Sequence, residues 1–151
     1  MKEKEIPVGR ITGQLSNMVR RLINKTFADF PYSGAENGCI SFIVEQAGKK
    51  QSEGIFQRDL EKEFNLRSPT ASEIIKKLEA KGLIVRESIE ADGRKKKIIP
   101  TQKALECDAA SRKKLREMEK QIVKGISKEE IDSFRAVSKK LMENLYAAVE
   151  K

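Results

Sequence analysis

Hydroxyl and basic side chains share one face of residues 68–81, a segment whose apolar residues recur at helical spacing. Short hydroxyls can reach a phosphate or a base edge, and lysines supply positive charge for phosphates or guanine. We therefore expect this face to contact a nucleic acid through Ser68, Thr70, Ser72, Glu73, Lys76 and Lys77. The alternative is a capped helix with solvated lysines, and for Ser68 we expect N-capping to be the larger role.

Glu73 is the acidic residue of this face, and its role stays open between two interpretations. Its carboxylate can accept a hydrogen bond from cytosine N4, or repel phosphates and so sharpen specificity. It can equally sit at the edge of the face, paired with Lys76 or Lys77 across one helical turn.

A second basic cluster follows the dipeptide Asp92-Gly93, which is a strong signal for a hairpin turn. An arginine at the tip of such a hairpin suits a narrow minor groove, where the negative potential is enhanced. The expected DNA contacts of this region are Arg86, Arg94, Lys95 and Lys96. We expect Asp92 to orient an arginine, either Arg86 or Arg94, and the alternative is a merely solvated hairpin.

The charge distribution agrees with a polyanionic partner. The 151 residues carry a net charge of +8, and residues 55–103 hold 12 Lys and Arg against 8 Asp and Glu, which is half of that surplus. Histidine is absent, which excludes Ser-His-Asp and Cys-His catalysis and every His-ligated metal site. With no Gly-rich phosphate loop and no clustered carboxylates either, we expect no enzyme, no cofactor and no metal.

These residues need a helix-turn-helix and a hairpin to position them. The patterns predict helices over residues 56–64 and 69–81, with Pro69 in the first turn and Gly82 ending the second helix. Strand candidates follow at 83–85 and 97–99. A helix-turn-helix followed directly by a hairpin is a winged helix.

Further helical patterns flank the predicted winged helix. They cover residues 8–29, 35–47 and 101–124, the last with Leu105, Ala109, Leu115, Met118 and Ile122 on its apolar side. A final helix begins at Ser127 with an S-x-x-E capping box. The terminal helices carry wide apolar stripes, so we expect a homodimer built on Ile11, Leu15, Ile131, Phe134, Leu141 and Leu145. The alternative is that these helices close a monomeric core.

The run from Phe56 to Thr101 resembles the MarR (multiple antibiotic resistance regulator) family of bacterial transcription factors. The resemblance is carried by LRSPTAS, by LEAKGLIVR, by the Asp92-Gly93-Arg94 wing, and by the strand-then-Thr entry into a long helix. The order and length of the flanking helices also match the family. One departure is Ala104, which stands where the family usually has glycine.

The resemblance implies a mainly α fold with a small β wing, in one domain over residues 1–151. A winged-helix lobe would span about 35–101, and dimerisation helices about 1–30 and 102–151. It implies a sequence-specific regulator, a repressor that binds a pseudo-palindromic double-stranded DNA operator as a dimer and responds to a small-molecule effector. An anionic aromatic inducer is expected at the level of the family only.

Two alternatives complete the sequence-based expectations. The winged helix could serve as a protein-interaction module or as a non-specific nucleic-acid-binding module. Some proteins of the family sense oxidants through cysteine, but Cys39 lies in an apolar helical stretch, and the acidic residues beside Cys107 disfavour a reactive thiolate. With no signal peptide and no membrane-spanning stretch visible, we expect a cytoplasmic protein without a membrane partner.

Overall fold

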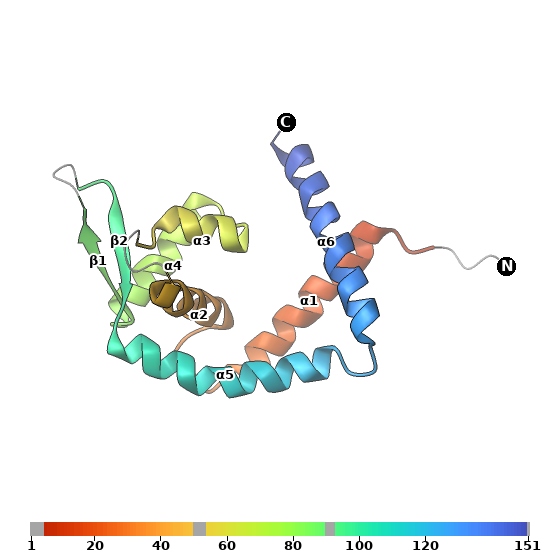
Figure 1. Ribbon diagram of the computed structural model, residues 1–151, viewed down its shortest axis with the longest axis horizontal. Coiled ribbons are helices and arrows are strands. Elements are labelled where there is room, and N and C mark those ends of the chain that lie inside the picture. The colour runs from red at the N-terminus through yellow and green to blue at the C-terminus, as the bar shows by residue number, and fades with distance from the viewer. Residues whose placement is uncertain (1–4, 50–53, 90–92, 151) are drawn as a thin grey trace. The chain divides into compact units, whose positions relative to one another are not determined.

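A computed structural model describes residues 5–49, 54–89 and 93–150. Within these ranges the elements are α1 (Val8–Thr26), α2 (Gly34–Lys49), α3 (Gln57–Phe64), α4 (Ser68–Ala80), β1 (Ile84–Ser88), β2 (Lys96–Pro100), α5 (Gln102–Ile122) and α6 (Lys128–Val149) (Figure 1). The predicted class, mainly α with a small β wing, is confirmed. Among the described helices, none is both long enough and apolar enough to cross a membrane.

The chain divides into two compact units, Met1–Lys114 and Leu115–Lys151. The core of the first unit lies where α2, α3 and α4 pack beside the β hairpin (Figure 1). Its fully buried large side chains include Ile40, Ile43, Leu60, Ile75, Leu78, Leu83, Ile84 and Ile98. Removing these aliphatic side chains from water is the main contribution that holds the helix-turn-helix against the hairpin.

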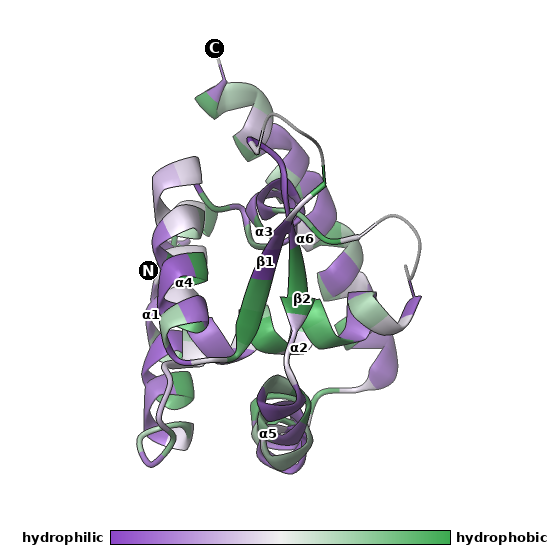
Figure 2. Ribbon diagram, turned by 90° about the vertical axis from the view of Figure 1, so that its left-hand side faces the viewer, coloured by the Kyte–Doolittle hydropathy of each residue, from purple (hydrophilic) through white to green (hydrophobic). Residues whose placement is uncertain are grey.

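The hairpin is antiparallel, with Ile84 opposite Pro100 and Ser88 opposite Lys96. Its strands run further toward the tip than the sequence predicts, because polar residues continue the ladder beyond the β-branched ones. Hydrophobic residues occupy the base of the hairpin near α2 and hydrophilic residues its distal half (Figure 2). Ile55 adds an isolated bridge, in which the Ile98 N–H donates to the Ile55 carbonyl at 2.7 Å.

The end of α4 follows the predicted glycine stop. Gly82 adopts φ 71°, the left-handed region that favours glycine. The Gly82 N–H donates to the Glu79 carbonyl and the Leu83 N–H to the Leu78 carbonyl, both at 3.0 Å. This is a Schellman motif, which satisfies carbonyls that the helix end would leave without partners.

The start of α4 differs from the prediction, because the N-cap is Arg67 and Ser68 already lies in the first turn. No side chain caps this helix end, so the expected capping role of Ser68 is wrong.

Helix α1 is shorter than predicted, because it ends at Thr26 instead of residue 29. After it, Phe27, Phe30 and Tyr32 form edge-to-face ring contacts.

The buried face of α5 matches the predicted one only in part. Ala104, Asp108 and Ser111 are buried, whereas Leu105 is 42% exposed. The expected N-cap is confirmed, since the Thr101 hydroxyl accepts from the Ala104 N–H at 3.3 Å. Leu115 and Met118 of the predicted side are half-buried, so the apolar periodicity identified this helix but misplaced its inner face at Leu105 and Ala109.

The second unit contains the end of α5, a turn at Gly125 with φ 79°, and α6. The predicted capping box is present. Ser127 Oγ accepts from the Glu130 N–H at 3.2 Å, and the Glu130 carboxylate accepts from the Ser127 N–H at 2.8 Å. The hydrogen bond from the Ser127 N–H, followed by the Ser127 side chain, lowers the pKa of the Glu130 carboxylate.

Candidate nucleic-acid interface

The outer face of α4 carries the predicted polar set. Ala71, Ile75 and Leu78 are buried, and Ile74 is half-buried, so this side of the helix faces the core. On the other side Ser68, Thr70, Glu73, Lys76 and Lys77 are exposed and Ser72 is half-buried. The structure thus brings these six predicted residues together on one accessible helix surface.

The first turn of α4 is fixed from α3 by a residue that the sequence-based interpretation missed. The Gln57 side-chain amide donates to the Ser68 carbonyl at 3.2 Å and to the Ser68 hydroxyl at 3.1 Å. Between the two helices Asn65 takes a left-handed conformation, φ 52°, and the Leu66 N–H bonds the Glu61 carbonyl at 2.9 Å. A tight turn and one amide therefore set the start of the exposed face.

Glu73 pairs with Lys77 at 3.1 Å across one turn of α4. This is one of the two interpretations that the sequence leaves open for Glu73. Because both side chains are well exposed, the pair contributes little to stability. It does lower the net positive charge on that part of the face, beside Lys76.

The Arg86 side chain forms an ion pair with Glu79 of α4. Its guanidinium donates to the Glu79 carboxylate, with Nε at 3.0 Å, and this hydrogen bond lowers the pKa of Glu79. The pair joins β1 to α4, so Arg86 orients the helix relative to the hairpin. The expected partner Asp92 lies outside the described residues, as does any contact that it makes.

A basic cleft of about 310 Å³ lies between the start of α3, α4 and the hairpin. Its cationic lining residues are Arg58, Arg86, Arg94, Lys95 and Lys96. Phe56 lies among them, with the Arg58 guanidinium 5.6 Å and the Lys95 ammonium 5.8 Å from its ring centroid. Such cation–π contacts hold charged groups in place. The cleft therefore concentrates positive charge between α3, α4 and the hairpin.

Phe56 and Arg58 were missed by the sequence-based interpretation. They lie more than 30 positions before the basic hairpin, and no local pattern links the two segments. The Ile55–Ile98 bridge brings them together, because it places the start of α3 beside β2. The one sequence feature that pointed to this contact is the apolar Ile55, which is expected to be buried against another element.

Polar contacts from α2 secure the far end of α4. The Lys81 ammonium pairs with the buried Glu36 carboxylate at 2.6 Å. Glu36 also closes a capping box with Ser33 at the start of α2. Helix α4 is thus held at its beginning by Gln57 and just past its end by Glu36.

The two cysteines have different surroundings. Cys39 is buried, as predicted, and burial together with the nearby Glu36 charge raises the pKa of its thiol to about 11. Cys107 is half-buried, and its carbonyl accepts from the Tyr32 hydroxyl at 3.3 Å. Burial is also the main cause that raises the pKa of Tyr32. A neutral, enclosed Cys39 thiol is a poor nucleophile.

The predicted dimerisation residues lie on α1 and α6. Ile11 and Leu15 on α1, and Phe134 and Leu145 on α6, are exposed large hydrophobic residues, and Ile131 and Leu141 are half-buried. Within the described residues no group of three His, Cys, Asp or Glu side chains could hold a metal ion.

Residues 40–95 match the model of the MarR family. No curated protein matches the chain. Among solved structures, the Staphylococcus aureus MepR–DNA complex is 23% identical, with a TM-score of 0.81 over 93% of this chain and 99% of that one. A putative MarR-family regulator from Listeria monocytogenes, complexed with 26mer DNA, is 24% identical, with a TM-score of 0.78 over 95% and 90%.

A third similar structure is the transcription regulator MarR from Oenococcus oeni, which is 24% identical with a TM-score of 0.73 over 91% of this chain and 99% of that one. At these identities the likeness establishes the fold. It extends over α1, α5 and α6 as well as over the segment that the family model matches.

Proposed function

With the resemblance to the MarR family confirmed over residues 40–95 and in the fold, we propose that this protein is a transcription regulator that binds double-stranded DNA sequence-specifically. One observation carries the proposal: the exposed polar face of α4 lies next to the five-cation cleft that Arg58 and the hairpin line. A helix face for base edges beside a basic surface for phosphates is what operator recognition needs.

In the proposed complex each element has a separate role. Helix α4 enters the major groove, where Thr70, Ser72 and Lys76 meet base edges and nearby phosphates. The cleft residues Arg58, Lys95 and Lys96 bind the phosphate backbone, and Arg94 reaches the minor groove from the hairpin. Gln57, Glu79 and Arg86 act indirectly, because they fix the position of α4.

The proposal includes a homodimer on a pseudo-palindromic operator. The exposed apolar residues of α1 and α6 would form the interface, since soluble monomers rarely expose such surface. The S. aureus and L. monocytogenes structures contain DNA, which supports the same partner for this chain. We further propose a cytoplasmic repressor without enzymatic activity that responds to a small-molecule effector.

Salt titration with lysine variants tests the proposal. Each phosphate that the protein neutralises adds about −0.9 to the log–log slope of affinity against salt. If Lys76 contacts a base edge, Lys76→Ala reduces the preference for the correct base at one operator position by roughly 1–3 kcal/mol. If Lys77 contacts a phosphate, Lys77→Ala weakens binding to all sequences alike. Lys128→Ala on α6, which removes the same charge elsewhere, leaves both quantities unchanged.

A salt-insensitive interaction would contradict the proposal and favour a protein-interaction module. Binding that is salt-sensitive but equal for every duplex would favour the non-specific nucleic-acid module instead.

A further inference from the structure

The fully buried residues of α5 have small or polar side chains. Ala104, Asp108 and Ser111 recur at helical spacing along the buried face of α5, and all three are almost fully enclosed. A face with one methyl group, one carboxylate and one hydroxyl buries little apolar area. Hydrophobic packing alone therefore does not fix the angle of α5 on α2.

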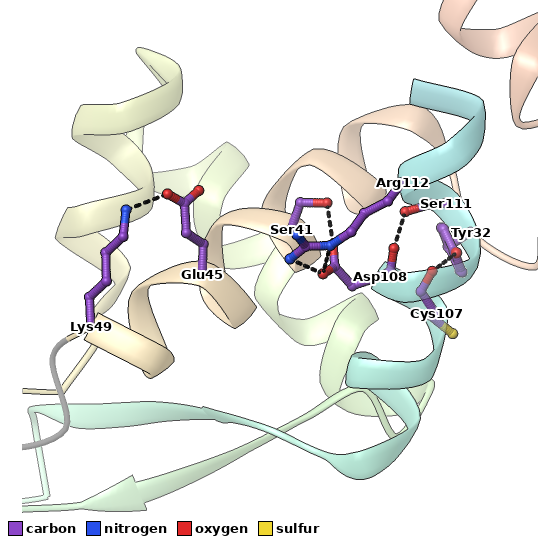
Figure 3. Close-up of polar contacts among 8 residues, drawn as sticks. All are labelled: Tyr32, Ser41, Glu45, Lys49, Cys107, Asp108, Ser111 and Arg112. Carbon is purple, nitrogen blue, oxygen red and sulfur yellow. Dashed lines mark hydrogen bonds and ion pairs between the residues drawn. The ribbon is translucent and has the colours of Figure 1, made fainter. Parts of the chain in front are cut away.

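Directional polar contacts take that role. Asp108 is 2% exposed, and its carboxylate accepts from Ser41 Oγ of α2 at 2.7 Å (Figure 3). Its second oxygen accepts from Arg112 on the same helix, with Nε at 2.8 Å and the terminal nitrogen at 2.7 Å (Figure 3). We call Ser41, Asp108 and Arg112 the α2–α5 joint.

The joint is costly to disturb because its carboxylate is buried. If the buried Asp108 carboxylate lost the Ser41 hydrogen bond, water could not replace that bond. A rotation of α5 away from Ser41 is therefore unfavourable. Ser111, by contrast, donates only to the Asp108 main-chain carbonyl of its own helix at 3.0 Å. Of these two buried or half-buried serines, Ser41 alone links α5 to another element through its hydroxyl.

The geometry of α5 amplifies changes at the joint. The helix continues unbroken from Asp108 to Ile122, and each residue adds about 1.5 Å of length. A tilt of about 10° at Asp108 therefore displaces the far end by about 4 Å. That displacement is close to the rise of one base pair, about 3.4 Å.

We propose that the α2–α5 joint sets the half-site spacing that the dimer accepts, with Asp108 and Ser41 as positioning residues. The inference rests on the proposed function, because it needs a dimer whose two α4 helices bind one operator. A fixed joint holds each winged-helix lobe at one angle on α5. A loosened joint lets the lobes adapt to operators of several spacings.

The test measures affinity for a series of duplexes in which two half-sites are moved apart by single base pairs, and for a duplex with one half-site. Wild-type protein should show a sharp optimum. Ser41→Ala should reduce the ratio between the best spacing and its neighbours by roughly two- to thirtyfold, while affinity for the single half-site stays unchanged. Asp108→Asn should broaden the profile in the same direction.

Ser111→Ala is the matched control, because it also removes a serine hydroxyl beside Asp108, but one that donates within α5 rather than across to α2. It should keep the wild-type profile, and thermal melting confirms that each variant is folded. A sharp wild-type optimum that Ser41→Ala leaves intact overturns this inference alone. Equal wild-type affinity for every duplex overturns the proposed function, and the inference with it.

Discussion

Arg86 in β1 and Arg94 just before β2 have different surroundings, which give them different roles. Arg86 is held by Glu79 of α4, whereas Arg94 is an exposed residue that lines the basic cleft. The sequence placed both among the DNA contacts, because both are basic residues near a predicted turn. It could not show Glu79 as the partner of Arg86, since that pairing depends on how α4 packs against β1.

Arg94→Ala should therefore weaken DNA binding and leave the fold intact. Surface substitutions usually change stability by less than about 0.5 kcal/mol, and the loss of affinity should be largest on operators with A·T-rich flanks, where the minor groove narrows. Arg86→Ala is the contrasting variant. It should lower the melting temperature, because it removes the ion pair that joins β1 to α4.

Titration of one operator with each variant, with melting curves alongside, measures both effects. If Arg94→Ala bound DNA with wild-type affinity, with A·T-rich and G·C-rich flanks alike, the hairpin would not be part of the interface.

At the scale of elements, Gly82 ends α4 by adopting a left-handed backbone conformation. Gly82 has φ 71° and open space where a Cβ would stand, so an added methyl group meets conformational strain and no clash. Gly82→Ala should destabilise the protein by about 1–2 kcal/mol, the cost of a left-handed conformation for a residue with a Cβ.

Gly38 in α2 is the matched control for that substitution. A Cβ at this position would meet the Phe64 ring at 3.6 Å, an ordinary contact, and alanine favours the helix interior. Gly38→Ala should stabilise the protein by roughly 0.5–1 kcal/mol. Urea unfolding of both variants gives the comparison, and a Gly82→Ala protein as stable as wild type would show that the left-handed stop is dispensable.

Element type was predictable from the sequence where a local signal exists. Gly82, Thr101 and the Ser127–Glu130 pair each define a helix end through contacts within a few residues, and all three are confirmed. The capping role of Ser68 failed, because its hydroxyl bonds Gln57 of another helix. The inner face of α5 was predicted wrongly at Leu105 and Ala109, because apolar periodicity cannot detect a buried Asp108.

The six helix-surface residues of the candidate site were predictable because they lie on one helix, where spacing fixes the face. Phe56, Gln57 and Arg58 were not, because tertiary packing alone brings them to α4 and the hairpin. Long-range pairing of this kind leaves no mark in a local pattern.

At the scale of the whole molecule, the exposed apolar residues of α6 predict self-association. Phe134 and Leu145 are each 61% exposed in one chain, more than a soluble monomer keeps in a continuous stripe. Light scattering at micromolar concentration should give about twice 17.1 kDa. Phe134→Glu should shift the mass toward 17.1 kDa, because it places a charge in the interface.

Lys139→Glu serves as the control for that variant, since Lys139 is an exposed polar position on the same helix. It should keep the dimer mass. A wild-type chain that stays at the mass of a monomer at high concentration would remove the paired half-sites from the account.

Sequence-specific recognition of paired half-sites by α4 and the hairpin is the central claim, and selection of bound sequences from a random duplex pool tests it most directly. The account predicts enrichment of a pseudo-palindrome, with two inverted half-sites whose centres lie about 10–10.5 base pairs, one helical turn, or a multiple of it apart. Selected duplexes with no shared sequence and no symmetry would contradict it.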